Sequence, residues 1–294
     1  MTEASFVSSV RKRPVLDSFL AYRETGAGAP IVFLHGNPTS SYVWRNVVPH
    51  VSGSSRCLAP DLVGMGASGK PDIAYRYADH VRYLDAWFSS MDLRDVTLVG
   101  YDWGGVLALD WASRHSERVR GVVVFETFLR GMHLRDLPPA GQQLFGALRT
   151  PGVGEKLVLE ENVFLAKSLE NGVTKGLSSA DRDVYFAPFP DPSSRRPVLA
   201  FPRELPFDGS PPDVLEVLER NAAWLARRDG IGKALFTFDS GLMSNAPSVV
   251  TWAKETVPEL EVVPLGHAGH HAPEDAPDAI GQALRDWLAK HPAK

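Results

Sequence analysis

The chain has 294 residues, of which 31 are basic and 35 acidic, giving a formal net charge of −4. Hydrophobic residues make up 44%, which is typical of globular proteins and excludes a disordered or fibrous chain. The mildly acidic balance provides no basic surface for nucleic acid, and no stretch approaches the about 18 apolar residues of a membrane span. Residues 1–13 lack the apolar segment of a signal peptide, so we expect a soluble, cytoplasmic protein.

Short apolar runs alternate with a helical pattern over the first 125 residues. We predict four buried strands in this region, at 31–34, 56–59, 96–100 and 119–125. Apolar residues at helical spacing predict a helix over 77–91, between the second and third strands. Runs that are apolar at nearly every position and separated by helices are typical of a parallel sheet covered on both faces.

The pattern changes between residues 127 and 228. No strong strand is predicted there, several stretches have helical periodicity, and eight of the 23 prolines fall between Pro188 and Pro212. Strands resume at 234–238 and 260–265, with helices predicted at 247–254 and 277–289. We therefore predict an α/β core made of residues 1–126 and 229–294, interrupted by a helical cap at 127–228. An insertion after the carboxyl end of a strand lies over the edge where such sheets bind ligands.

The most specific local motif is Gly100-Tyr101-Asp102-Trp103-Gly104-Gly105, which stands between a predicted strand and a helical pattern. This is the context of a nucleophile elbow, in which small residues allow a tight turn that lifts one side chain clear of the sheet. The alternative is that Asp102 only caps the helix. A carboxylate that attacks a saturated carbon forms an alkyl ester that water can hydrolyse, so we expect an alkyl halide or an epoxide as the electrophile.

The second step of such a reaction requires a base that activates water. Three histidines, His267, His270 and His271, follow the last predicted strand, where the hydrolase chain order places the base, and their spacing does not select one of them. Two acids follow strands at the same edge, Glu126 and Asp239, and either could orient the base. A glutamate directly after buried valines is costly unless it is paired, which favours Glu126, whereas Asp239 also suits a turn.

The leaving group needs hydrogen-bond donors. In a serine hydrolase these come from the residue after the nucleophile and from the loop after His-Gly, which here are Trp103 and Asn37. Their indole and amide N–H groups are neutral donors that suit a weakly hydrated anion such as chloride or bromide. The alternative for Trp103 is simple packing in the core.

Taken together, these features resemble a haloalkane dehalogenase of the α/β-hydrolase fold. The resemblance covers nearly the whole chain and is carried by residues 35–45, 60–66, 102–104, 126, 157–164, 195–203, 270 and 274–278. It implies that Asp102 is the nucleophile, that His270 is the base and that Glu126 is the acid. It also implies the subgroup of the family in which the catalytic acid follows strand six. It also implies that Asn37 and Trp103 bind halide, that a small apolar halogenated compound is the substrate, and that no cofactor or metal is needed.

The resemblance also suggests which residues line the substrate pocket. We expect these to be Phe145, Phe164, Pro202, Leu205, Met243 and His271. The family usually has histidine where this chain has Tyr101, and commonly an aromatic residue where it has His271. We therefore expect His271 to make the pocket more polar.

Three alternatives use the same scaffold or a different class of function. Coelenterazine-type luciferases, which are cofactor-independent oxygenases, share the triad, and Ser244-Asn245 resembles them. Epoxide hydrolases generally use cap tyrosines, and Tyr185 is the only tyrosine between residues 127 and 228. A non-catalytic protein that binds a small ligand would not need all three triad candidates. The only cysteine, Cys57, excludes an internal disulfide and a multi-cysteine zinc site.

Overall fold

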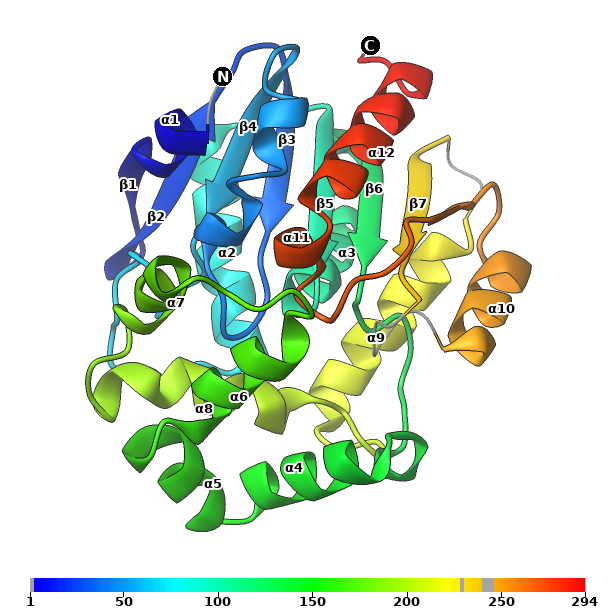
Figure 1. Ribbon diagram of the computed structural model, residues 1–294. Helices are drawn as coiled ribbons and strands as arrows, with labels where there is room; N and C mark the ends of the chain where they lie inside the picture. The colour runs from blue at the N-terminus through cyan, green and yellow to red at the C-terminus, as the bar shows by residue number, and fades with distance from the viewer. Residues whose placement is uncertain (1–2, 228–229, 240–245, 294) are drawn as a thin grey trace.

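An eight-stranded sheet forms the centre of the structure, a computed structural model that describes residues 3–227, 230–239 and 246–293 (Figure 1). The strands are β1 (Val10–Val15), β2 (Ser18–Thr25), β3 (Ala29–Leu34), β4 (Ser55–Pro60), β5 (Val96–Tyr101), β6 (Val119–Phe125), β7 (Gly232–Thr237) and β8 (Glu261–Pro264). Their order is β1-β2-β4-β3-β5-β6-β7-β8. The pairs β1–β2 and β2–β4 are antiparallel, and the other neighbouring pairs are parallel.

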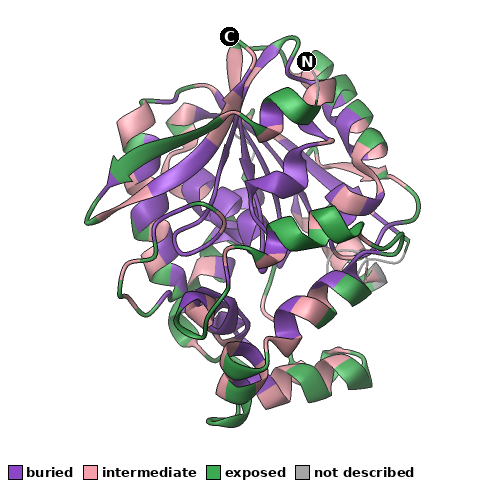
Figure 2. Cartoon of the chain, turned by 60° about the vertical axis from the view of Figure 1, so that its left-hand side comes forward, coloured by how far each residue is buried: buried purple, intermediate pink, exposed green. Residues whose placement is uncertain are grey.

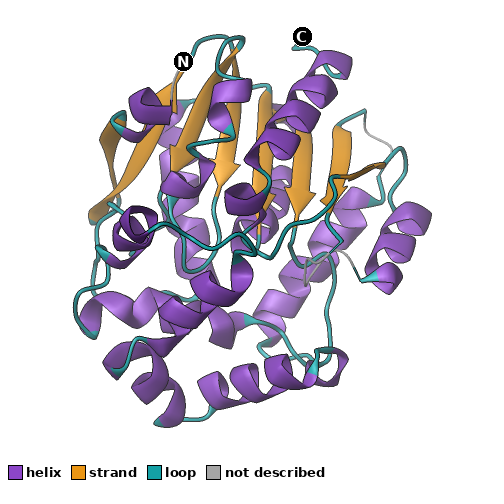
Figure 3. Cartoon of the chain, viewed as in Figure 1, coloured by secondary structure: helices purple, strands orange, loops and turns teal. Residues whose placement is uncertain are grey.

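The prediction of a mostly parallel sheet flanked by helices is confirmed (Figure 3). Each strand predicted from the sequence corresponds to one of β3 to β8, with ends that shift by one or a few residues. The antiparallel hairpin β1–β2 was not predicted. Strand β1 lies at the edge and is exposed along nearly all of its length, with Arg11, Lys12 and Arg13 in sequence, so it lacks the apolar alternation that signals a strand.

Helices cover both faces of the sheet. In Figure 1, α2 (Tyr77–Met91) and α3 (Trp103–Arg114) lie behind the sheet, and α12 (Pro277–Lys290) lies in front of it. The other helices outside the predicted cap are α1 (Glu3–Val7), α10 (Pro247–Thr256) and α11 (Ala272–Asp275), with single 3₁₀ turns at Ser41–Trp44, Val48–His50 and Ser116–Arg118. No helix in the described ranges is both long and apolar enough to span a bilayer.

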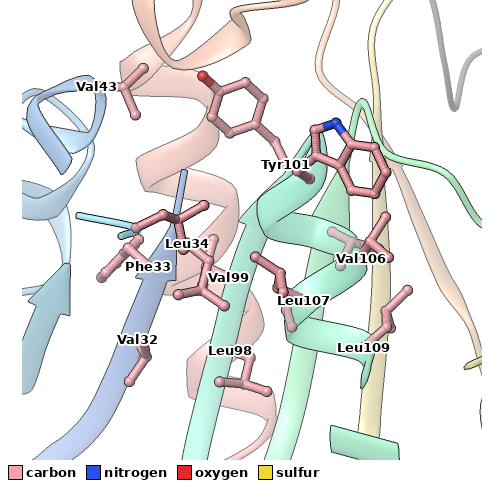
Figure 4. Close-up of a cluster of buried hydrophobic side chains, with 14 of the residues drawn as sticks. Val32, Phe33, Leu34, Val43, Leu98, Val99, Tyr101, Val106, Leu107 and Leu109 are labelled. Atoms are coloured by element: carbon pink, nitrogen blue, oxygen red, sulfur yellow. The ribbon is translucent and has the colours of Figure 1, made fainter. Parts of the chain in front are cut away.

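The core lies between the central strands and these helices, and Figure 2 shows the central strands as buried. Figure 4 shows Leu98 and Val99 along β5, Leu107 and Leu109 along the neighbouring helix α3, and Tyr101 at the end of the strand. Strand β5 is buried at all six positions because it has neighbours on both edges and helices on both faces. This packing gives the turn that follows β5 a rigid base.

The segment after β6 is helical. It contains α4 (Pro139–Arg149), α5 (Val153–Glu155), α6 (Val163–Gly172), α7 (Ser179–Phe186), α8 (Arg196–Glu204) and α9 (Pro212–Leu225), a π-helical turn at Lys156–Glu160, and 3₁₀ turns at Leu134–Asp136 and Ser193–Arg195. Figure 1 shows α4 to α8 gathered beyond the carboxyl ends of the parallel strands. The last helix, α9, also packs along α3, where Asn221 Nδ2 donates to the carbonyl oxygen of Val106 at 3.3 Å.

The order of the strands indicates where a ligand would bind. The chain leaves β3 toward β4 on one side and returns to β5 on the other, so the direction of winding reverses between β3 and β5. In open α/β sheets, ligands bind outside the carboxyl ends of the strands at such a switch point. Asn37 follows β3 and Asp102 follows β5, so both lie at this position.

Candidate active site

Asp102 occupies the turn between β5 and α3. Its backbone has φ 51° and ψ −132°, a conformation that residues other than glycine rarely adopt. The turn is tight because α3 approaches β3 closely, and a Cβ atom on Gly104 would lie 2.1 Å from the carbonyl oxygen of Leu34. Thr127 Oγ1 donates to the carbonyl oxygen of Asp102 at 2.7 Å and helps to hold the turn. These are the features of the nucleophile elbow that the motif predicts.

The carboxylate of Asp102 has one oxygen bound to the neighbouring loop. The backbone N–H of Asn37 donates to Asp102 Oδ1 at 2.7 Å. The loop passes this close because Gly36 has no side chain, since a Cβ atom there would lie 2.3 Å from the same oxygen. Asp102 Oδ1 is therefore held by a backbone donor, and Oδ2 is the oxygen that faces His270.

His270 lies between two carboxylates. Its Nε2 is 3.4 Å from Asp102 Oδ2, and its Nδ1 is 3.2 Å from Glu126 Oε2. Glu126 follows β6 directly and its side chain is fully buried, whereas the ring of His270 is 15% exposed. The structure thus brings together the three predicted triad residues, which come from three separate loops at one edge of the sheet.

The two carboxylates determine the charge of His270. Burial alone lowers the pKa of the imidazole, because the charged form loses its hydration. The hydrogen bonds to Asp102 and Glu126, with the attraction of both charges, outweigh burial and raise the pKa from 6.5 to about 10. His270 therefore carries a proton at neutral pH.

The other candidates for base and acid lie elsewhere. His267 is exposed on the loop before the site. Asp239 follows β7 and is exposed, and its backbone N–H donates to the carbonyl oxygen of Gly266 at 2.8 Å. The ring of His270 bonds to Glu126 rather than to Asp239.

Trp103 and Asn37 flank the carboxylate of Asp102. The indole of Trp103 is 2% exposed and packs against Tyr77, Phe128 and Phe201, with ring centroids 5.3 to 5.8 Å away. Its N–H donates to no residue in the described part of the chain. Asn37 Nδ2 donates to the carbonyl oxygen of Val198 in α8 at 3.2 Å, and the group retains a second N–H. Both side chains thus carry neutral donors on residues adjacent to Asp102, Trp103 along the chain and Asn37 through its backbone hydrogen bond to the carboxylate.

The predicted pocket residues come mainly from the cap. Phe164, Pro202 and Leu205 are buried, and Phe145 is half-buried against Phe207 at 5.5 Å between ring centroids. Met243, like Ser244-Asn245, lies outside the described residues. That these side chains line a substrate pocket stays a prediction.

His271 belongs to a buried chain of hydrogen bonds that was not predicted. Its Nδ1 is 3.3 Å from the hydroxyl of Tyr101, and its Nε2 is 3.1 Å from Ser168 Oγ in α6. The Tyr101 hydroxyl also meets Thr39 Oγ1 at 2.7 Å. Burial, together with the charge of His270, lowers the pKa of His271 well below 6.5, so its ring is neutral. The chain connects the loop of the base to the cap and to the loop after β3.

Two acids of α11 also connect the base loop to the cap. Asp275, which is fully buried, accepts from the backbone N–H groups of Gly269 at 2.8 Å and of Thr174 and Lys175 at 2.9 Å. Glu274 pairs with Arg45 at 2.5 Å, and Arg45 pairs with Asp181 of α7 at 2.9 Å. Within the described ranges, no group of three or more histidine, cysteine or acidic side chains could hold a metal ion.

Comparisons with known proteins agree with this geometry. Residues 29–177 match the family model of the alpha/beta hydrolase fold. A haloalkane dehalogenase of Mesorhizobium japonicum is 47% identical over 282 residues, covering 94% of this chain and 89% of the relative. The crystal structure of a haloalkane dehalogenase from Agrobacterium tumefaciens C58 is similar with a TM-score of 0.92 at 41% identity, covering 96% of this chain and 97% of that one. The crystal structure of a haloalkane dehalogenase from Bradyrhizobium elkani USDA94 also has a TM-score of 0.92 at 41% identity, covering 96% of this chain and 98% of that one.

Proposed function

This chain belongs to the haloalkane dehalogenases of the α/β-hydrolase fold, and from that premise we propose that Asp102, His270 and Glu126 hydrolyse small apolar haloalkanes through an ester on Asp102. The products are an alcohol, a halide ion and a proton. The observation that carries this proposal is a carboxylate at the tip of a nucleophile elbow, with one oxygen bound to a backbone donor and the other facing His270.

In the first step, Oδ2 of Asp102 attacks the carbon that bears the halogen. The new bond is carbon to oxygen, the carbon–halogen bond breaks, and its electron pair leaves with the halide. This displacement needs no base, because the carboxylate already has the electron pair that forms the bond. Oδ1 remains on the backbone N–H of Asn37 and becomes the carbonyl oxygen of the ester.

The departing halide requires donors on the side opposite the attacking oxygen. The indole N–H of Trp103 and the second N–H of the Asn37 amide supply two. Both are neutral and buried, so they stabilise the charge that develops on the halogen without needing to shed much water. The aromatic rings around Trp103 hold its indole in one orientation.

In the second step, His270 takes a proton from water as the water attacks the ester carbonyl of Asp102. Ester formation removes the negative charge of Asp102, which is one of the two charges that raise the pKa of His270. The imidazolium can then release its proton and act as a base, while Glu126 stabilises the cation that forms again during attack. Collapse of the tetrahedral intermediate releases the alcohol and restores the carboxylate.

Epoxide hydrolysis would require a donor for the epoxide oxygen. The cap tyrosine that could serve, Tyr185, is buried and donates its hydroxyl to Glu274 in the cluster around Arg45. The hydroxyl of Tyr185 is therefore used in a structural hydrogen bond rather than being available to an epoxide oxygen. The geometry supports carbon–halogen cleavage better.

The experiment that tests the proposal separates the two steps. His270→Phe should release about one equivalent of halide per active site from 1-iodobutane and then stop, because the ester forms but is not hydrolysed. Intact mass spectrometry should show one butyl group, and peptide mapping should place it on Asp102. The exposed residue His267 provides the matched control, since His267→Phe should turn over repeatedly. Sustained turnover by His270→Phe, or an adduct at another acid, would contradict the mechanism.

A further inference from the structure

A cap helix with a proline in its interior touches the proposed halide site. Helix α8 (Arg196–Glu204) contains Pro202. The residue four positions earlier is Val198, whose carbonyl oxygen accepts from Asn37 Nδ2 at 3.2 Å. This contact joins residues 161 positions apart in the sequence.

The proline explains why the carbonyl of Val198 is free. In an α-helix the carbonyl of each residue accepts from the N–H four residues later. Pro202 has no N–H, and the ring of an interior proline pushes the carbonyl of the fourth preceding residue away from the helix axis. The carbonyl of Val198 is therefore left without its usual partner, and the amide of Asn37 takes that place.

This contact determines which way the Asn37 amide faces. Asn37 Oδ1 is buried and accepts no hydrogen bond from the described residues. If the amide turned over, this oxygen would face the carbonyl oxygen of Val198, and two acceptors would oppose each other. The carbonyl thus keeps the NH₂ group of Asn37 in place, with its second N–H free for an anion.

Helix α8 is held firmly enough for the position of this carbonyl to matter. At its start, Arg196 pairs with Asp72 at 2.6 Å. At its end, the buried carboxylate of Glu204 accepts from the backbone N–H of Tyr77 at 2.9 Å and from Arg76 at 3.0 Å. Between them, the ring of Phe201 stacks on Trp103, with centroids 5.3 Å apart and planes inclined by 30°. One helix therefore contacts both proposed halide donors.

We propose that Pro202 is a positioning residue of the halide site, which acts by leaving the carbonyl of Val198 free to orient the Asn37 amide. This proposal rests on the proposed function, because it assumes that Asn37 binds halide. It assigns to the missing N–H of Pro202 a role that is separate from any contact between the proline ring and substrate.

Halide binding without turnover tests this role. The dissociation constant of bromide can be measured by tryptophan fluorescence at constant ionic strength. Pro202→Ala restores the N–H, which should bond to Val198 within the helix and release Asn37. We expect bromide to bind about tenfold more weakly, as for partial loss of one hydrogen bond to an anion. Pro197→Ala, at the start of the same helix where an N–H has no helical partner, should leave binding unchanged.

A second variant separates the N–H from the ring. Introducing L-lactic acid at position 202 forms a backbone ester that has the side chain of alanine but no N–H. This ester should bind bromide within about twofold of the unaltered chain, since the carbonyl of Val198 stays free. Weakening as large as that of Pro202→Ala would overturn the proposal, as would unchanged binding in Pro202→Ala. Asn37→Ala distinguishes the two levels of inference: if it binds bromide normally, the proposed halide site itself is wrong.

Discussion

The backbone N–H of Asp102 donates to the carbonyl oxygen of Glu126 at 2.8 Å, which joins the two carboxylate residues independently of His270. Both residues follow neighbouring parallel strands whose last residues, Tyr101 and Phe125, are paired in register. Both also have positive φ angles, 51° and 43°. Such backbone conformations cost on the order of 1–3 kcal/mol each and persist where the surrounding structure enforces them. The positions of both side chains are therefore built into the sheet.

The first prediction concerns the acid that supports His270. Glu126→Gln should reduce kcat by about 10³- to 10⁴-fold, because a neutral amide neither holds the histidine tautomer nor stabilises its cation. Asp239→Asn should stay within several-fold of the unaltered enzyme, because Asp239 is exposed and His270 bonds to Glu126. Steady-state bromide release from 1,2-dibromoethane measures both. The reverse ranking would place the acid after β7.

The sequence predicts these two positions for physical reasons that can be stated. Asp102 stands in a glycine-rich turn after an apolar run, and Glu126 ends a run of buried valines, so both could be found from local patterns. His270 could not be chosen this way, because His267 and His271 lie on the same loop and only the resemblance selected it. The geometry then shows that the ring of His270 is the one that lies between both carboxylates.

Other contacts depend on residues that are distant in the sequence. Two hydrogen bonds link the core to the cap, one from Asn37 to Val198 and one from Thr174 to Asp275. No local sequence pattern predicts either of them. The exposed strand β1 escaped prediction because its stability comes from pairing with β2 rather than from burial. Sequence patterns therefore identified the chemistry and the central sheet, but not the contacts that position the site.

The second prediction concerns the halide donors. Trp103→Phe and Asn37→Ala should each reduce kcat by about 10²- to 10³-fold, because each removes one donor from the charge that develops on the leaving group. Trp224→Phe is the matched control. Trp224 lies in α9, away from the site, and its buried indole N–H donates to Ser116 Oγ at 2.8 Å. The kcat of Trp224→Phe should be unchanged. Equal rates for the Trp103 and Trp224 variants would refute the assignment.

The third prediction concerns the clamp on the base loop, which consists of the hydrogen bonds from the backbone N–H groups of Gly269, Thr174 and Lys175 to the carboxylate of Asp275. Asp275→Asn should lower the free energy of unfolding by about 1–3 kcal/mol, because an amide leaves at least one of the three backbone N–H groups that meet this buried side chain without an acceptor. It should also lower kcat, since Gly269 precedes His270 directly. Asp278→Asn, at a side chain that is 82% exposed and pairs with His50, should change stability by less than about 0.5 kcal/mol. Urea unfolding measures both, and equal effects would argue against the clamp.

The fourth prediction follows from the pKa of His270, which is raised from 6.5 to about 10 in the folded protein. Between these values the folded chain keeps a proton that the unfolded chain has lost. The stabilisation from His270 is therefore complete below pH 6.5 and is lost as the pH rises toward 10, with a slope of at most about 1.4 kcal/mol per pH unit. His270→Phe removes this titration, so its stability should fall less steeply over the same range.

Urea unfolding at several pH values between 6.5 and 9 tests this prediction. The free energies of unfolding of the unaltered chain and of His270→Phe should approach each other as the pH rises, because the groups common to both contribute equally and cancel in the difference. His267→Phe should run parallel to the unaltered chain, since its substitution leaves His270 and both carboxylates in place. If the His270→Phe curve were also parallel, His270 would be neutral between Asp102 and Glu126. Ester formation would then not be needed to make it a base.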